Sequence, residues 1–574
     1  MSRRVLLFLC ALTGVVAGLA AVLLKSIAHA CREFAASLVA WHPGMVWVAP
    51  ALPVAGIFLC LFLVRWIYRR KHYDKSLSGV IYSTHNGDGN VPFYHTFGHI
   101  LTSGMAVGLG GSAGLEAPIA LTGSAIGSNL GKLLKLKRDQ KVLLLACGGG
   151  AGIAAVFASP VAGTMFACEV LLPTFSHSVL VPLLIASATG SVVASAIWTT
   201  HSFVQVAPVW SYDQLQYYLL LGVLAGGFAA YLIKCSLVLA KRLEKIPSVW
   251  KRAVAGGLVL YVVFLLFPCL KGEGYDHIAS LGQGSLTGAL AGLPKVSLEH
   301  QPWSMVVLLL LLLLLKPVVS VLFLESGGDG GIFGPSLFCG AFLGYLLYAI
   351  LTLLGLQDLS PQVFICLGMG GVLAGVMHAP LSGIFLTAEL TGSFSLLIPL
   401  MLVAALSTFV CRSLSGHSLY KSILISRGEQ ADEQVELRLL SQIKAAALLD
   451  RNFIAFQPND TLRTMQQAVV RSAFSVFPVL TEDGSLAGMV MADELRPLYQ
   501  KTLFDDNILA CDLMHVPNQI LQPENTLAEA VNAFDSSAWR VLPVLQDGAF
   551  VGFLDKGAVL DYYREMLHDK TEML

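Results

Sequence analysis

Charged residues are scarce in this sequence. Asp, Glu, Lys and Arg make up 13% of its 574 residues, whereas soluble domains carry about 25%. Hydrophobic residues make up 55%, and the mean hydropathy is +0.69. This composition excludes an ordinary soluble protein and indicates one that crosses a membrane many times. The formal net charge is zero, so the chain lacks the basic balance of a nucleic-acid-binding protein, and we expect no nucleic acid as a partner.

The eleven cysteines lack the spacing of a metal site or a disulfide framework. They form no CxxC pair, and all but Cys511 fall in the apolar part of the chain. We therefore expect small buried hydrophobic side chains at these positions, and no metal. No nucleophile, metal-ligand or phosphate-loop constellation stands out either, which argues against an enzyme and predicts no cofactor.

Many apolar segments are long enough to span a bilayer, which takes about 20 residues in a helix. Clear candidates are 5–24, 46–66, 178–198, 217–240, 253–270, 304–323, 336–355 and 395–411. We therefore predict a multi-spanning α-helical membrane protein. The first segment has the basic start of a secretory signal peptide, but its apolar stretch continues past residue 20, which favours a membrane helix. Arg3 and Arg4 favour a cytoplasmic start, and we expect both termini on that side.

The composition changes sharply near residue 427. Before it, apolar segments are joined by short glycine-rich turns; after it, SRGEQADEQVELRLLSQ is polar and charged. We predict a transmembrane domain over 1–426, a linker over 427–435, and a small α/β domain over 436–574.

Each domain contains an internal repeat. In the first, GGGAGIAAVFASPVAGTMFACEV (148–170) resembles GMGGVLAGVMHAPLSGIFLTAEL (368–390), with identical residues recurring in register 220 positions later. A duplicated membrane unit is common in transporters, which often direct broken helices at a site near the middle of the bilayer. In the second, QPNDTL (457–462) recurs as QPENTL (522–527), and each copy is followed by two β-rich runs around a DG turn.

Three glycine-containing motifs lie inside the membrane domain: LSGVI (77–81), GLEAP (114–118) and GGIFGP (330–335). Glycine permits close backbone approach, and proline suits the first turn of a helix. Such sequences favour half-helices whose free N–H groups face inward, and a helix N-terminus binds anions. Several helix N-termini that converge would make an anion site without lysine or arginine. Because such a site contains no full positive charge, the anion can leave it again. Taken singly, each motif also suits ordinary helix packing.

The three motifs in this order resemble those of the CLC family of chloride channels and chloride/proton exchangers. The resemblance extends over nearly the whole chain. It includes the tandem CBS domains that many members carry at the C-terminus, expected here at about 440–500 and 508–570. The resemblance implies inverted repeats, a homodimer with one pathway per subunit and, in a bacterium, residence in the inner membrane.

The resemblance also implies roles for individual residues. LSGVI matches the family's GSGIP, so Ser78 would offer its hydroxyl to the central anion. GLEAP matches G(K/R)EGP and places Glu116 at the gating glutamate. GGIFGP matches GGIFAP, so the backbone N–H groups of Ile332 and Phe333 would face the anion, and HSLYKSIL places Tyr420 at the family's central tyrosine. The other pore-motif residues are Gly114, Ala117, Pro118, Gly331 and Pro335.

Glu116 is an ionisable group in an apolar segment, and its negative charge matches that of the anion that the site would bind. Ionised, its carboxylate can occupy an anion position at a helix N-terminus and block the path; protonated, it loses that attraction and leaves. The alternative is a glutamate that only stabilises the dipole of its own helix.

The sequence departs from the family at functional positions. Leu115 replaces the basic residue before the gating glutamate, which should weaken the outer anion site, and Ala117 replaces the glycine after it. Family exchangers usually have two adjacent acids at the end of SPVAGTMFACEV, and the second passes protons to the cytoplasm. That second position is Val170 here, as in many channel members. The first acid, Glu169, matches Glu389 in the repeat, which favours a structural role for both.

We therefore predict a CLC-type protein that conducts chloride, and also bromide and nitrate, as a passive channel gated by protonation of Glu116. The alternative is a proton-coupled chloride/proton antiporter of the same fold, since a water chain or Glu169 could replace the missing acid. A magnesium transporter, which also carries a CBS pair, would need several acids facing water inside the membrane.

The CBS pair lacks the usual adenosine pattern, which is Thr or Ser after the last strand and Asp three residues on. Those positions are Met491 and Glu494 in the first unit, and Asp555 and Ala558 in the second. Only Glu494 suits a ribose contact. We expect weak or no binding of adenine nucleotides and a mainly structural role.

Ser78 also generates a prediction about selectivity, because a hydroxyl donor replaces part of the hydration shell of a small anion. We expect Ser78→Pro to shift the preference from chloride toward nitrate, as the family resemblance implies. Flux of each anion from liposomes measures the ratio, and an unchanged chloride-to-nitrate ratio would count against Ser78 as a ligand.

Overall fold

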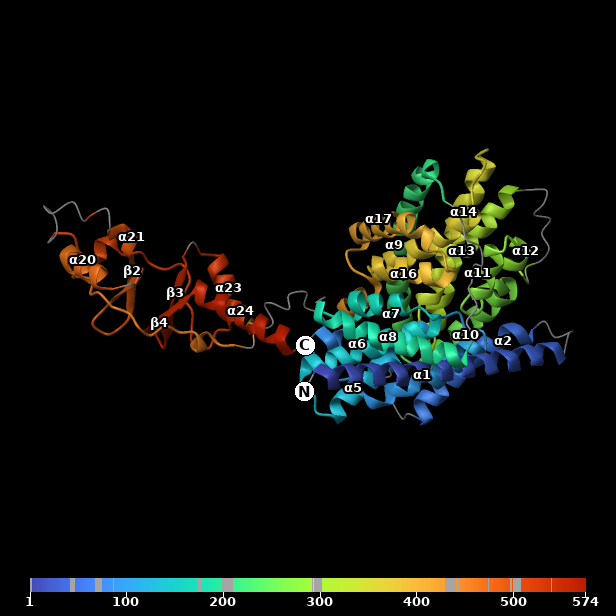
Figure 1. The fold of residues 1–574 in the computed structure, drawn as a ribbon, viewed down its shortest axis with the longest axis horizontal. Helices are drawn as coiled ribbons and strands as arrows, with labels where there is room; N and C mark the ends of the chain where they lie inside the picture. Colours follow the sequence, from blue (N-terminus) through green and yellow to red (C-terminus); the bar gives the residue numbers. More distant parts are fainter. Residues whose placement is uncertain are drawn as a thin grey trace. The chain divides into compact units, whose positions relative to one another are not determined.

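The computed structural model describes residues 3–573 except 42–46, 68–74, 86, 174–176, 199–209, 292, 294–301, 429–439, 442, 473, 496–497, 499–506 and 538. The chain forms two compact units, Met1–Ala431 and Asp432–Leu574. In the described residues the first unit consists of helices, and the second combines short helices with two β-hairpins (Figure 1).

Nine helices of the described part are long and apolar enough to cross a membrane. Their main segments are α1 (Arg3–Trp41), α2 (Val48–Phe62), α6 (Arg138–Phe157), α8 (His177–Ile197), α9 (Leu215–Glu244), α10 (Val249–Leu266), α13 (Pro302–Glu325), α14 (Phe333–Leu353) and α17 (Leu397–Ser415). All but α6 contain most of a segment expected from hydropathy. The helix α6 was not among the expected segments, because its glycines lower the mean hydropathy of its sequence. Those glycines allow close packing, since a Cβ on Gly148 would lie 1.9 Å from the carbonyl oxygen of Gly123.

The first unit contains nine further α-helices in its described residues, several of them labelled in Figure 1. They are α3 (Ser78–His85), α4 (Gly98–Gly108), α5 (Glu116–Leu133), α7 (Pro160–Phe166), α11 (Tyr275–Gly282), α12 (Leu286–Ala289), α15 (Pro361–Met377), α16 (Pro380–Thr391) and α18 (Leu419–Ser426). Single turns of other helix types are η1 (Leu63–Ile67), η2 (Phe93–Thr96), η3 (Ala167–Leu171), η4 (Tyr212–Gln214), η5 (Pro268–Leu270) and η7 (Phe394–Leu396). Several begin inside the unit, so that their N-termini are buried in protein.

The sequence repeat recurs in three dimensions. The packed pair α5–α6 corresponds to α14–α15, and α7 corresponds to α16. Both α6 and α15 end at a non-glycine residue in the left-handed conformation, Ala158 with φ 54° and His378 with φ 53°. Both following helices then begin at a proline, Pro160 and Pro380, where the missing N–H costs nothing. Because α7 also packs against α16, the two repeats meet within the unit.

The second unit contains the same substructure twice. Strands β1 (Val476–Leu480) and β2 (Leu486–Met491) form one antiparallel hairpin, and β3 (Val541–Gln546) and β4 (Ala549–Asp555) form the other. Each hairpin has a register shift near the end of its first strand, before a turn that contains Asp-Gly. The helices are α20 (Leu462–Arg471), α21 (Ala492–Leu495), α22 (Ala510–Leu513), α23 (Leu527–Asp535) and α24 (Lys556–Met573), with the turn η8 (Ala445–Ala447).

Two separate hydrophobic cores match these two copies. Phe477 and Leu462 belong to one core, and Leu542 and Leu527 belong to the other. Leu462 and Leu527 hold equivalent positions at the starts of α20 and α23, as the last residues of the repeated hexapeptides. The repeat read from sequence therefore places the same apolar residue in each core.

Glu494 is already engaged in the second unit. Its two carboxylate oxygens lie 2.9 and 3.0 Å from Nε2 of His515. We expect this contact to compete with any ribose hydroxyl, so a calorimetric titration of the full chain with ATP should give no measurable binding at micromolar concentration. Micromolar affinity would contradict the structural role predicted for the CBS pair.

Candidate functional site

The site begins with a reciprocal pair of backbone hydrogen bonds. The N–H of Gly114 donates to the carbonyl of Gly331, and the N–H of Gly331 donates to that of Gly114, both at 2.8 Å. The pair brings the start of α5, at Glu116, close to the start of α14, at Phe333. Side chains would not fit here, because a Cβ on Gly331 would lie 2.6 Å from the Cβ of Ala117. Two helix N-termini, each with about half a positive charge, therefore face one region.

The carboxylate of Glu116 lies at the N-terminus of the opposite helix. Glu116 is fully buried, and its Oε2 accepts a hydrogen bond from the backbone N–H of Gly334 at 3.3 Å. Its Oε1 accepts a hydrogen bond from the hydroxyl of Tyr275. Gly114 must lack a side chain for this reason too, since a Cβ there would lie 2.0 Å from Glu116 Oε2. A negative group thus sits where the free N–H groups of α14 favour an anion.

The remaining pore-motif residues complete these two helix starts. Ile332 is the N-cap of α14 and Phe333 its first residue, so their N–H groups belong to the turn that has no intrahelical acceptors. Pro118 in α5 and Pro335 in α14 lie in the first turn of their helices, where a missing N–H costs nothing.

Two buried hydroxyls form a second group of donors. Ser78 begins α3 and Tyr420 lies in the first turn of α18, and these two helices pack together. Both side chains are buried, and among the described residues neither hydroxyl has a hydrogen-bond partner. Tyr420 is also close enough to Glu116 for a Coulombic interaction. Since buried hydroxyls are normally paired, these two donors are available to a ligand.

A buried polar network fixes the loop that precedes α14. His99 Nδ1 lies 2.9 Å from Asp329 Oδ2, and the Thr102 hydroxyl donates to the same oxygen. His95 Nδ1 lies 2.9 Å from His99 Nε2, and Lys75 donates to two carbonyls of the same loop at 2.7 and 2.8 Å. This network was not predicted from the sequence, although Asp329, placed between glycines in ESGGDGG, was a signal for it.

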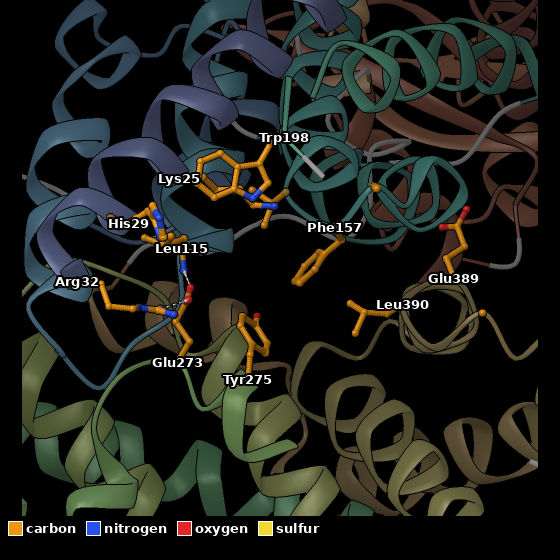
Figure 2. Close-up of a pocket in the computed structure, with 14 residues that line it drawn as sticks. Lys25, His29, Arg32, Leu115, Phe157, Trp198, Glu273, Tyr275, Glu389 and Leu390 are labelled. Carbon is orange, nitrogen blue, oxygen red and sulfur yellow. Dashed lines mark hydrogen bonds and ion pairs between the residues drawn. The ribbon is translucent and has the colours of Figure 1, made fainter. Parts of the chain in front are cut away.

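A pocket of about 340 Å³ adjoins the start of α5 (Figure 2). Lys25 and Arg32 line it from α1, and Leu115 lines it beside them. Glu273 joins these groups, because its Oε1 accepts from the backbone N–H of Leu115 at 3.3 Å and its Oε2 from Arg32 at 3.4 Å. Two basic side chains of α1 therefore lie near Leu115, and one of them, Arg32, is paired with the acid that contacts Leu115. No spacing in the sequence indicates this, since the partners are far apart along the chain.

The two repeats cap one another through the glutamate that occupies the same position in each repeat. Glu169 accepts hydrogen bonds from the N–H groups of Leu381 and Ser382 at the start of α16, at 3.0 and 2.7 Å. Glu389 accepts from Val161 and Ala162 at the start of α7, at 3.1 and 2.8 Å. Each carboxylate thus stabilises the helix N-terminus of the other repeat.

The position expected to carry the inner proton relay lies in the same turn as Glu169. Val170 is buried in η3, and this turn contacts α3, the helix that begins with Ser78. Its side chain has no titratable group, and the one carboxylate of the turn is that of Glu169, whose oxygens already accept backbone hydrogen bonds.

The comparisons with known proteins agree with this geometry. The sequence profile of the family described as "Voltage gated chloride channel" matches residues 56–412, and that of the CBS domain matches residues 445–500. The chain belongs to the CLC family. The prediction of a CLC-type helical membrane fold with inverted repeats and an α/β CBS part is confirmed.

Individual CLC proteins are similar over most of the membrane unit. The H+/Cl− exchange transporter ClcA of Vibrio parahaemolyticus is 31% identical over 331 residues, 56% of this chain and 67% of that one. A ClcB-like chloride channel protein of Ralstonia nicotianae is 28% identical over 400 residues, 66% of this chain and 86% of that one. The crystal structure of a slow cyanobacterial Cl−/H+ antiporter aligns with TM-score 0.63 and 21% identity, over 75% of this chain and 98% of that one.

The cross-capping glutamates of this CLC chain generate a stability prediction. Glu169→Ala and Glu389→Ala should each lower the free energy of unfolding by about 1–3 kcal/mol, because each leaves partly buried N–H groups without an acceptor. The corresponding Gln variants should lose less, since an amide oxygen still accepts a hydrogen bond. Thermal unfolding of the full chain in detergent measures the effect, with the exposed Glu482→Ala as control. Ala variants as stable as the control would contradict the capping role.

Proposed function

We propose that this protein is a CLC transporter that exchanges chloride for protons across the membrane, and that the coupling passes through Glu116. The proposal replaces the passive channel favoured by the sequence with the alternative considered there. Chloride would bind between the N-termini of α5 and α14 and the hydroxyls of Ser78 and Tyr420. The proposal includes a homodimer with one pathway per subunit, bromide and nitrate as further anions, and cytoplasmic termini in an inner membrane.

The observation that carries the proposal is the hydrogen bond from Gly334 N–H to the carboxylate of Glu116. It places the carboxylate on the N–H groups of α14 that would bind chloride. Carboxylate and chloride therefore compete for one position, and chloride enters only when the carboxylate leaves. A carboxylate that leaves this position loses the donors that favour its charge, so it takes up a proton. This mutual exclusion links the movement of an anion to the movement of a proton.

The relatives support coupling. The Vibrio parahaemolyticus protein is an exchanger by name and has the higher identity of the two relatives described above. The Ralstonia nicotianae protein is named a channel, so the names alone do not carry the proposal.

A passive channel is the second candidate, and Val170 is the observation that favours it. A proton crossing a low-dielectric interior needs a titratable carrier or a water chain, and valine provides no proton site. Exchange therefore requires that a water chain, or Glu169 released from its cap, take the place of the missing acid.

Simultaneous recording of chloride and protons separates the two candidates. With the full chain in liposomes, we expect a chloride gradient to drive protons uphill, and acid to raise chloride flux because it protonates Glu116. Glu116→Gln should abolish the proton movement and most of the pH dependence while keeping or raising chloride flux, since the amide carries no charge to compete with the anion.

Glu482→Gln serves as the matched control, because this exposed glutamate lies in the second unit. Chloride flux without any uphill proton movement in the unsubstituted protein would refute exchange and restore the channel.

A further inference from the structure

The start of α11 and the loop before it each make one contact with the start of α5. Glu273 accepts a hydrogen bond from the backbone N–H of Leu115, the N-cap residue of α5. Two residues later, the hydroxyl of Tyr275 donates to the carboxylate of Glu116 itself. The α11 segment lies outside both repeated segments, so this donor has no counterpart that the repeat would supply. The carboxylate therefore has one donor from α14, Gly334 N–H, and one from α11.

Tyr275 is held in place on several sides. The N-cap residue Gly274 has φ 94°, a left-handed conformation that suits glycine, and a Cβ there would lie 2.4 Å from the ring of Phe338. The Tyr275 ring packs edge-to-face on Phe157 at 6.2 Å, and Phe157 stacks on Phe333 at 6.0 Å. Figure 2 shows Tyr275 and Phe157 both projecting into the pocket. The hydroxyl is thus positioned by the helix that carries the anion-binding motif.

Gly334 leaves the space that the contact needs. A Cβ at this position would lie 3.3 Å from the Tyr275 hydroxyl and 3.5 Å from Glu116 Oε1. The family motif GGIFAP has alanine here, whereas this chain has GGIFGP. The departure from the motif and the tyrosine hydroxyl therefore meet at one point, beside the carboxylate.

We propose that Tyr275 is a positioning residue that latches the Glu116 carboxylate in the anion pathway. Its hydroxyl adds a hydrogen bond to the seated carboxylate, which chloride must break to enter. Release of the carboxylate, not only its protonation, then limits anion movement. The inference rests on the proposed role of Glu116 in transport, but it holds for an exchanger and for a channel alike.

Removing the hydroxyl alone tests the latch. Tyr275→Phe leaves the ring and its packing on Phe157, and it leaves the other charged and titratable groups near the carboxylate unchanged. Those groups are Lys25 and Arg32 on α1, Glu273 in the loop before α11, and Tyr420 on α18. Because a hydrogen bond to a charged group contributes about tenfold or more to an equilibrium, we expect chloride flux at neutral pH to rise by about that factor. The rise should shrink in acid, where the carboxylate is protonated and leaves more readily.

The experiment measures chloride efflux from liposomes against pH for the full chain. Tyr231→Phe is the matched control, since its hydroxyl bonds the carbonyl of Leu314 away from the site. In the Glu116→Gln background, Tyr275→Phe should change flux less than twofold, because no carboxylate remains to be latched. A purely structural role would instead change flux in both backgrounds.

A second variant covers the case in which Tyr275→Phe does not fold. Gly334→Ala keeps both partners but places a Cβ 3.3 Å from the Tyr275 hydroxyl, so we expect it to displace the hydroxyl and also to raise flux at neutral pH. Variants of both positions that match the unsubstituted chain and Tyr231→Phe in rate and pH profile would overturn the latch. Absence of proton coupling alone would leave the latch intact and refute only exchange.

Discussion

The reciprocal hydrogen bonds between Gly114 and Gly331 are the constraint on which the rest of the membrane unit depends. They bring together the N-termini of α5 and α14, whose partial positive charges repel each other in a medium of low dielectric. A negative group between the two helix N-termini stabilises this arrangement. The chain provides one in Glu116, and a mobile anion is the alternative occupant. The position that stabilises the two helix N-termini is therefore also the position at which an anion would bind.

Where α7 packs against α16, the buried helix N-termini are stabilised by carboxylates of the protein alone. The helices α7 and α16 also begin inside the protein, and their N–H groups are satisfied by Glu389 and Glu169, each from the other repeat. At these two helices each acid accepts two adjacent backbone N–H groups. At α14 the acid is Glu116, which begins its own helix and accepts one backbone N–H, from Gly334, and the hydroxyl of Tyr275. The capping carboxylates and the carboxylate of Glu116 thus differ in their hydrogen-bond donors.

Local features of the sequence predicted the helix starts and the repeats well. Glycine and proline at GLEAP and GGIFGP report a backbone constraint within a few residues, and this constraint can be recognised without any partner. Tyr275, Glu273 and Lys25 were not predicted, because each acts through a contact with a helix far away in the chain. The α6 helix was missed for a related reason, since its glycines serve the packing against α5 and weaken the local hydropathy signal.

Two of the departures from the family motifs, at Leu115 and Gly334, lie beside residues from distant parts of the chain. Beside Leu115, where the family has a basic residue, Arg32 of α1 is paired with Glu273 of the loop before α11. The methyl group missing at Gly334 leaves the volume beside the Tyr275 hydroxyl. In both cases residues from outside the motifs lie at the position where this chain departs from them. Val170 offers no titratable group, so the proposed exchange would depend on water or on Glu169 for proton transfer on that side.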